Sequence, residues 1–215
     1  MTNKILLTKY HRKKPFLKSK EAIEVANLIV KIFPEYYGCF RASLLQKRNI
    51  IKKLFFTKNS EFEKIFTIKS GKELVGVATV INSKKLKIAK TLGFLKIVNY
   101  LGSKKVNKRK INSLKKSFCK INSPNPYLTR FGINLKFRGV KNLSSKLIRY
   151  VIKSEKFKLI AHVNKNNKRA IKFYLKNKFK IIDKRKKFYL IEFKGQKKIY
   201  YIGLKNLCIT TPINL

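Results

Sequence analysis

The sequence has few acidic residues, no tryptophan and no cysteine pattern that marks a known type of site. Only nine of its 215 residues are Asp or Glu, and its cysteines, Cys39, Cys119 and Cys208, are odd in number and lack the spacing of metal ligands. A disulfide framework or a zinc site is therefore not expected. No apolar run approaches the roughly 20 residues needed to span a bilayer. The apolar stretch at residues 5–7 is also too short for a signal-peptide core, so we expect a cytoplasmic protein without a membrane partner.

The sequence is instead rich in positive charge. Lys and Arg total 54, which gives a formal net charge of +45 and an isoelectric point of about 10.5. Such a charge attracts nucleic acid and other polyanions. The basic residues are mostly Lys, however, and they accompany abundant Ile, Asn, Phe and Tyr and are scattered instead of forming one stripe. Genome base composition accounts for that pattern, and we favour this interpretation; binding of nucleic acid through charge alone is the alternative.

Length and hydrophobic content predict a single domain. The chain is 44% hydrophobic, which is enough for a sizeable core, and one domain is the usual outcome at this length. We expect this domain at residues 19–193, between a basic N-terminal tail at 1–18 and a C-terminal strand or tail at 194–215.

The N-terminal part of the domain is predicted to form two helices and a hairpin. Residues 19–33 and 41–56 carry apolar side chains at helical spacing. Two stretches rich in β-branched residues, 62–68 and 74–81, then flank a turn that contains Gly71.

The C-terminal half is predicted to alternate strands and helices. A basic turn follows its first strand, and an Asn-rich turn precedes its second helix. The strands are expected at 127–135, 159–163, 180–183 and 188–193, and the helices at 143–153 and 170–177.

Two segments of this half resemble motifs of the GNAT superfamily of acetyl-CoA-dependent N-acetyltransferases. The turn Arg138-Gly139 is similar to the start of the family's pyrophosphate-binding signature. Asn167, followed by Ala170, Phe173 and Tyr174, resembles the start of the helix that packs beside the cofactor in that family. By itself, the second segment is equally an ordinary amphipathic helix with two core aromatic residues. Both segments, in the right order with a strand between them, favour the resemblance.

The resemblance covers roughly residues 19–193 and implies the GNAT fold. This is an α/β (α+β) domain with a central, mostly antiparallel, splayed sheet flanked by helices. It also implies acetyl-CoA as the cofactor, held by backbone N–H groups that have no intrahelical partner. The residues assigned to acetyl-CoA on this basis are Ile133, Asn134, Leu135, Arg138, Gly139, Val140, Lys141, Asn142, Leu143, Ser144, Asn167 and Tyr174.

The phosphate-binding signature departs from the family pattern. Asn142 and Ser144 stand where the family has glycines, and one extra residue follows Arg138. Because Asn tolerates left-handed backbone angles and Ser is a good N-cap, the loop can still form, with Lys141 adding charge. The alternative is a degraded loop that binds coenzyme A weakly or not at all.

The resemblance further implies transfer of an acetyl group to a primary amine of a small-molecule or protein acceptor, which the sequence does not identify. We expect Tyr174 to protonate the leaving thiolate, and the backbone amides of residues 133–135 to polarise the thioester carbonyl. Glu35 is the candidate base, although a solvated loop Glu is the commoner role. His162, near a strand end, is more often structural than catalytic.

Residues 82–126 form an insertion in this pattern. Apolar residues recur at helical spacing from Leu86 to Leu101 and again from Ile111 to Ile121. An unstructured loop of this length is uncommon in a compact domain, so we predict two inserted helices. These helices could line one side of the acceptor site. The alternative is that they are a surface elaboration or a dimer contact. Two functions therefore stay open: an N-acetyltransferase, and a catalytically weak or inactive GNAT-like basic module that binds nucleic acid or ribosomes.

Overall fold

The computed structural model describes residues 4–11, 19–34, 40–102, 107, 121, 123–185 and 187–195. The strands are β1 (Ile5–His11), β2 (Lys64–Ser70), β3 (Glu73–Asn82), β4 (Pro126–Ile133), β5 (Ile160–Asn164), β6 (Phe179–Lys184) and β7 (Phe188–Phe193). The helices are α1 (Ser19–Ile32), α3 (Leu44–Phe55), α4 (Leu86–Leu101), α6 (Leu143–Ser154) and α7 (Lys168–Lys176), with short 3₁₀ turns η1 (Ser83–Lys85), η3 (Leu135–Phe137) and η4 (Val140–Asn142).

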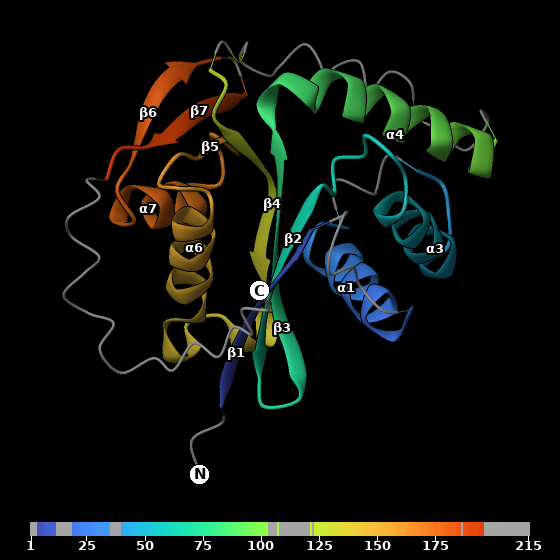
Figure 1. The fold of residues 1–215 in the computed structure, drawn as a ribbon, viewed down its shortest axis with the longest axis horizontal. Helices are drawn as coiled ribbons and strands as arrows, with labels where there is room; N and C mark the ends of the chain where they lie inside the picture. The colour runs from blue at the N-terminus through green and yellow to red at the C-terminus, as the bar shows by residue number, and fades with distance from the viewer. Residues whose placement is uncertain are drawn as a thin grey trace, which may run out of the picture.

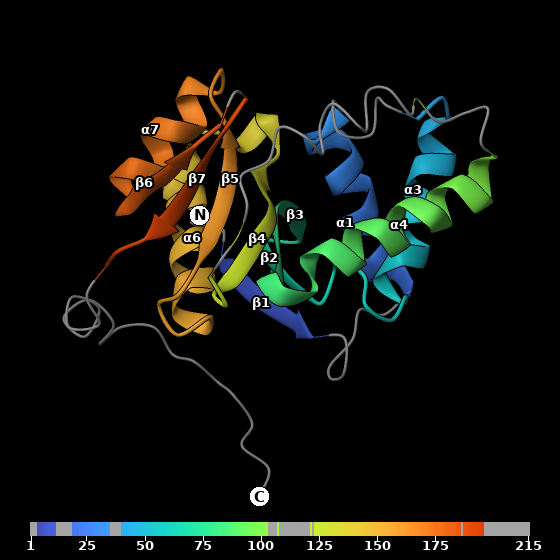
Figure 2. The ribbon, with the colours of Figure 1, turned by 90° about the horizontal axis from the view of Figure 1, so that it is seen from above.

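The strands form one seven-stranded sheet in the order β1-β2-β3-β4-β5-β7-β6. Neighbouring strands are antiparallel except β4 and β5, which are parallel. Helices α6 and α7 cover one face of the sheet, and α1, α3 and α4 lie on the other (Figure 1 and Figure 2). The predicted fold class, a mostly antiparallel sheet flanked by helices, is confirmed.

Strand β1 lies within the segment predicted to be a basic tail. It pairs with β2 along its whole length, from Ile5 opposite Ser70 to His11 opposite Lys64. Because β1 is an edge strand, most of its side chains are only partly buried, and it lacks a clear apolar alternation. The prediction of a tail is therefore wrong for residues 5–11.

Helices α1 and α3 form as the sequence predicts. Glu21 in the first turn of α1 and Lys31 in its last turn complement the helix dipole. Helix α3 begins at Leu44, later than predicted, because Ser43 and Gln46 form a capping box before it. The buried side chains of both helices join those of β2 and β3 in one hydrophobic cluster.

The insertion contributes α4, which confirms the first of its two predicted helices. Leu86 and Ala89 at the start of α4 pack with Ile81, Tyr127 and Ile160 at one end of the sheet. The second predicted helix, at residues 111–121, lies outside the described residues apart from Ile121, and the C-terminal segment lies outside them after residue 195. No helix in the described part of the chain has the length and hydropathy to cross a membrane.

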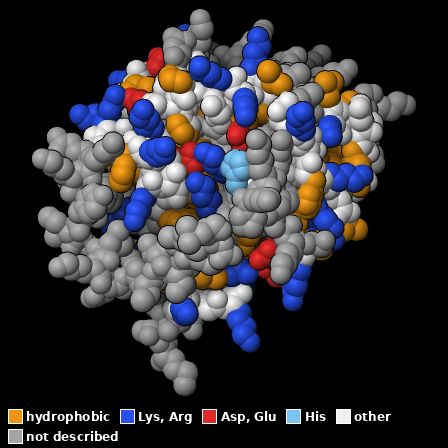
Figure 3. All heavy atoms as spheres, in the orientation of Figure 1, with side chains coloured by type: hydrophobic (Ala, Val, Ile, Leu, Met, Phe, Trp, Pro, Cys, Tyr) orange, Lys and Arg blue, Asp and Glu red, His pale blue; other side chains and the backbone are white. Residues whose placement is uncertain are grey.

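The opposite face of the sheet is covered by the second large hydrophobic cluster. Helix α6 buries five side chains at the predicted helical spacing, and they pack with residues of β2, β3, β4, β5 and β7. The buried side chains of α6 are Leu143, Leu147, Ile148, Val151 and Ile152. Outside the core, Lys and Arg side chains are spread across the face seen in Figure 3 without gathering in one stripe.

Candidate cofactor and acceptor site

The parallel strand pair of the sheet separates soon after it begins. Tyr127 pairs with Ile160 and Leu128 with Ala161, and no further rung joins β4 to β5 among the described residues. Strand β5 meanwhile stays paired with β7 up to Asn164. From Thr129 onward, the edge of β4 that faces β5 is therefore not paired with that strand in the described part of the chain.

Two backbone N–H groups of β4 face this separation. The N–H of Asn134 donates to the Val75 carbonyl oxygen of β3 at 2.8 Å. Successive residues of an extended strand direct their N–H groups to opposite edges. The N–H groups of Phe131 and Ile133 consequently face β5. The sequence assigned the amides of Ile133, Asn134 and Leu135. That of Ile133 faces the separation, that of Asn134 donates to β3, and Leu135 lies in the 3₁₀ turn η3 after the strand. The amide of Phe131 was not among those assigned.

The strand is also irregular at the point of separation. Thr79 of β3 pairs with Arg130, but the next residue, Val80, pairs with Leu128, so Thr129 is an extra residue in β4. Such a bulge bends a strand and re-aims its side chains. The Thr129 hydroxyl is held by the side chain and carbonyl of Thr79. The bulge therefore lies at the residue where the pairing of β4 with β5 ends.

The turn between β4 and α6 contains two left-handed residues. Gly139 has a φ of 84° and Asn142 a φ of 54°, and a right-handed residue follows each. Alternation of this kind turns successive N–H groups toward one point, which forms an anion-binding nest. The expectation that Asn142 can replace a glycine by adopting left-handed angles is confirmed for its backbone.

This turn is open to solvent in the described structure. Arg138, Gly139, Val140 and Asn142 are all exposed. A side chain built on Gly139 would meet no atom within 4 Å. The turn therefore has room for a bulky anion.

The start of α6 adds donors next to the turn. The Leu143 N–H donates back to the Val140 carbonyl, and the Leu143 side chain is buried in the core. The Asn142 side chain makes no cap hydrogen bond. Since the first N–H groups of a helix lack an intrahelical acceptor, those of Ser144 and Ser145 point toward the turn. The buried Leu143 side chain thus holds the turn against the core, and Ser144 and Ser145 add two N–H donors to it.

Helix α7 places Tyr174 against β4 from the α6 side. The Asn167 side chain caps the helix by accepting the Ala170 N–H at 3.0 Å, as the spacing of these residues suggests. The ring of Tyr174 lies 6.2 Å from that of Phe131 and 5.1 Å from that of Phe179. Burial raises the pKa of the Tyr174 hydroxyl, so it stays protonated at neutral pH and can donate a proton.

Five polar side chains, of which the sequence drew attention only to His162, gather on the other face of the sheet. The Tyr127 hydroxyl lies 2.9 Å from His162 Nδ1, which joins β4 to β5. Arg130 forms a buried ion pair with Glu61, and Lys90 Nζ lies 5.7 Å from the centre of the Tyr127 ring. These residues come from four separate parts of the chain, so no sequence spacing indicates them. Glu35, the candidate base, lies outside the described residues.

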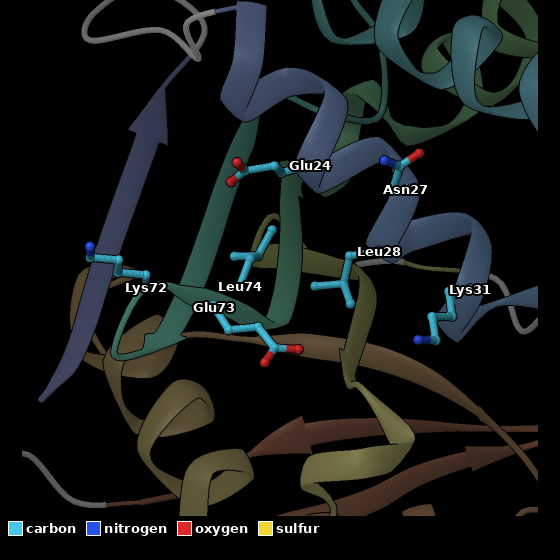
Figure 4. Close-up of a pocket in the computed structure, with 7 residues that line it drawn as sticks. All are labelled: Glu24, Asn27, Leu28, Lys31, Lys72, Glu73 and Leu74. Carbon is cyan, nitrogen blue, oxygen red and sulfur yellow. The ribbon is translucent and has the colours of Figure 1, made fainter. Parts of the chain in front are cut away.

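An open pocket of about 340 Å³ lies between α1 and the start of β3 (Figure 4). Its rim combines Glu24 and Glu73 with Lys31 and Lys72, and Leu28 and Leu74 line it. It is adjacent to the end of β4, because Val75, next to Leu74, binds Asn134. Asn134 is five residues beyond Thr129, which is about 16 Å along an extended strand. The pocket therefore does not lie at the point where β4 and β5 separate.

Comparison with solved structures identifies the fold. No protein-family model and no curated protein matches the sequence. The structure is similar to a solved acetyltransferase with a TM-score of 0.61 and 16% identity, over 89% of this chain and 100% of that one. It is also similar to an N-acetyltransferase from Staphylococcus aureus Mu50, with a TM-score of 0.60 and 13% identity over 86% and 98% of the two chains.

A third similar structure is PaiA N-acetyltransferase from Thermoplasma acidophilum, which was solved in complex with coenzyme A. Its TM-score is 0.50 and its identity 13%, over 89% of this chain and 99% of that one. These structures establish that the chain has the GNAT N-acetyltransferase fold, which agrees with the resemblance seen in the sequence.

Proposed function

We propose that this protein is an acetyl-CoA-dependent N-acetyltransferase that acts on a primary amine of a small-molecule or protein acceptor. The observation that carries the proposal is the unpaired edge of β4, which leads directly into an exposed turn with two left-handed residues. An extended pantetheine arm needs free strand amides, and a diphosphate needs converging N–H groups. Both are found on one continuous segment, and a similar fold has been solved with coenzyme A.

Acetyl-CoA would supply an activated acyl group as a thioester. The N–H groups of Gly139, Val140 and Lys141, together with those of Ser144 and Ser145, would hold its diphosphate, and the exposed Arg138 would add charge. The N–H groups of Phe131 and Ile133 would donate to the thioester carbonyl oxygen, whose negative charge grows as the amine attacks. Asn142 and Leu143 shape this turn through their backbone.

Tyr174 is the proposed acid, because its protonated hydroxyl lies on the helix that packs against Phe131. Asn167 holds that helix at its start. Glu35 is the proposed base. It follows α1, and the end of α1 is so close to β4 that a methyl group on Gly132 would collide with Ile32. An acceptor that reaches this part of β4 would therefore pass the C-terminal end of α1.

A thermal-shift measurement with acetyl-CoA tests the cofactor. A ligand at about 100 times its Kd, bound only by the folded chain, adds about 2.7 kcal/mol of stability. The measurement needs moderate salt and an equal concentration of ATP as control, because a net charge of +45 binds any polyphosphate. Stabilisation by acetyl-CoA well above that by ATP supports the proposal. Equal effects would leave the basic nucleic-acid-binding module as the better account.

Turnover is tested separately by release of free coenzyme A thiol with a panel of primary amines and peptide N-termini. Amine-dependent thiol release would support the proposed activity. Binding of acetyl-CoA with no release for any amine would reduce the proposal to a cofactor-binding fold.

A further inference from the structure

Lys90 extends from the inserted helix α4 over the point where β4 and β5 separate. The side chain is partly buried, and its amine lies 5.7 Å from the centre of the Tyr127 ring. Tyr127 belongs to β4, and its hydroxyl bonds to His162 of β5. The ring therefore bridges the two strands beside their last paired rung, and the amine of Lys90 lies above that bridge.

Tyr174 lies on the opposite face of the sheet, with its ring 6.2 Å from that of Phe131, four residues beyond Tyr127 on β4. Tyr127 packs in the cluster under α4, whereas Tyr174 packs in the cluster under α6 and α7. A thioester held between β4 and β5 would consequently have a lysine amine on one side and the proposed acid on the other.

The surroundings of Lys90 make its amine easier to deprotonate. Burial is the largest influence and lowers the pKa of the amine, whereas the Glu61 carboxylate raises it and Arg130, with a smaller effect, lowers it. Glu61 forms a buried ion pair with Arg130, so part of its charge is already compensated. A protonated amine cannot attack a carbonyl, so a lowered pKa makes the amine of Lys90 a better nucleophile near neutral pH.

We propose that Lys90 is an acetyl acceptor of its own enzyme, modified from acetyl-CoA bound between β4 and β5. The inference rests on the proposed function. The lone pair of Lys90 Nζ attacks the thioester carbonyl carbon, a C–N bond forms, and the C–S bond breaks. The departing thiolate gains a proton from Tyr174, the nitrogen releases its proton to solvent, and Tyr174 regains one from solvent, so the products are an acetyl-lysine and free coenzyme A. Modification replaces a basic amine on this side of the sheet with a neutral amide.

The test is peptide mapping by mass spectrometry after incubation of the full chain with acetyl-CoA. The variants are Lys90→Arg, which keeps the charge but is not acetylated, and Lys87→Arg, which changes an exposed lysine one turn earlier on α4. We expect Lys90 to carry most of the label in the wild type. Lys90→Arg should lose that label and Lys87→Arg should keep it, and urea-unfolded protein should lose the preference for position 90.

Thermal shift with acetyl-CoA and labelling with limiting acetic anhydride separate the ways in which the inference can fail. If acetyl-CoA stabilises the protein but labels exposed lysines as much as Lys90, self-acetylation is overturned and the proposed function stands. If acetic anhydride selects Lys90 and bound acetyl-CoA does not, the amine is reactive but out of line with the thioester, which also overturns the inference. If acetyl-CoA does not stabilise the chain, the proposed function fails first.

Discussion

The Tyr127 hydroxyl and His162 Nδ1 are 2.9 Å apart, and their contact joins the two parallel strands at the place where these strands part. Two residue pairs join the backbones of β4 and β5. A side-chain hydrogen bond beside these pairs therefore contributes much of the interaction that holds the two strands together where they begin to separate. The contact is also shielded from water, because Tyr127 is only 4% exposed. It links the local packing of the sheet to the geometry of the proposed thioester site.

Removal of the Tyr127 hydroxyl should therefore weaken the fold measurably. We expect Tyr127→Phe to lower the free energy of unfolding by about 0.5–1.5 kcal/mol, the usual net contribution of one hydrogen bond. Urea titration measures this change. Tyr189→Phe is a matched control on β7, because the contact of that ring with Lys165 Nζ, at 5.1 Å, does not need the hydroxyl. Equal losses in both variants would show that the strand bridge contributes nothing special.

The left-handed backbone of Asn142 gives a prediction about cofactor binding. Valine is strained at a positive φ by roughly 1–2 kcal/mol, so Asn142→Val should destabilise the chain and deform the turn. Asn59 has a similar φ of 59° in a loop outside the phosphate turn, so Asn59→Val is a control with the same strain. We expect both variants to unfold at lower urea, but only Asn142→Val to lose the thermal stabilisation by acetyl-CoA. Asn142→Gly should keep it.

The sequence predicts most of this fold because each element is encoded by its own residues. The helix at 143–153 has its apolar side chains at helical spacing, and Asn167 stands before a helix that then forms. Edge strand β1 escapes prediction since it is stabilised by pairing with β2 and not by its own apolar pattern.

The candidate site also contains a part that the sequence predicts and a part that it does not. The phosphate turn is a local feature, so residue types such as Gly139 and Asn142 are enough to indicate its left-handed backbone. The cluster around Tyr127 and Lys90 forms only when four segments that are distant in the sequence come together in the fold. The spacing of these residues in the sequence therefore does not predict it. Which amides of β4 are free depends on register, because a shift of one residue would exchange Ile133 for Asn134.

Tyr10 gives a prediction for alkaline pH. Burial, helped by the Glu21 carboxylate that accepts its hydroxyl at 3.1 Å, raises the pKa of Tyr10 to about 12. An unfolded tyrosine ionises near pH 10. Because the folded pKa is the higher one, the contribution of Tyr10 to stability is fully present below about pH 10 and is lost progressively as the pH rises toward 12.

The measurement is the free energy of unfolding of the wild type and of Tyr10→Phe at several pH values. The other tyrosines and the lysines titrate in both proteins, so their effects cancel in the difference. We expect the wild type to lose stability relative to the variant between about pH 10 and pH 12. A difference that stays constant across this range would show that Tyr10 ionises freely in the folded chain.

Replacement of Tyr174 tests the proposed acid without removing its packing. Tyr174→Phe keeps the ring that contacts Phe131, Phe173 and Phe179 and deletes only the hydroxyl. We expect kcat to fall by about 10²–10⁴-fold, the usual contribution of general acid catalysis, while stabilisation by acetyl-CoA is unchanged.

The control for this replacement is Tyr150→Phe, which removes the hydroxyl of a tyrosine on α6 whose ring packs edge-on against Phe66 at 5.8 Å. That variant should retain full kcat. Because burial raises the pKa of Tyr174, the wild-type rate should show no alkaline loss assignable to this hydroxyl below about pH 10, where a solvent-exposed tyrosine would begin to ionise. If Tyr174→Phe keeps the wild-type kcat, the thiolate takes its proton from another donor, and the position of α7 beside β4 then serves packing alone.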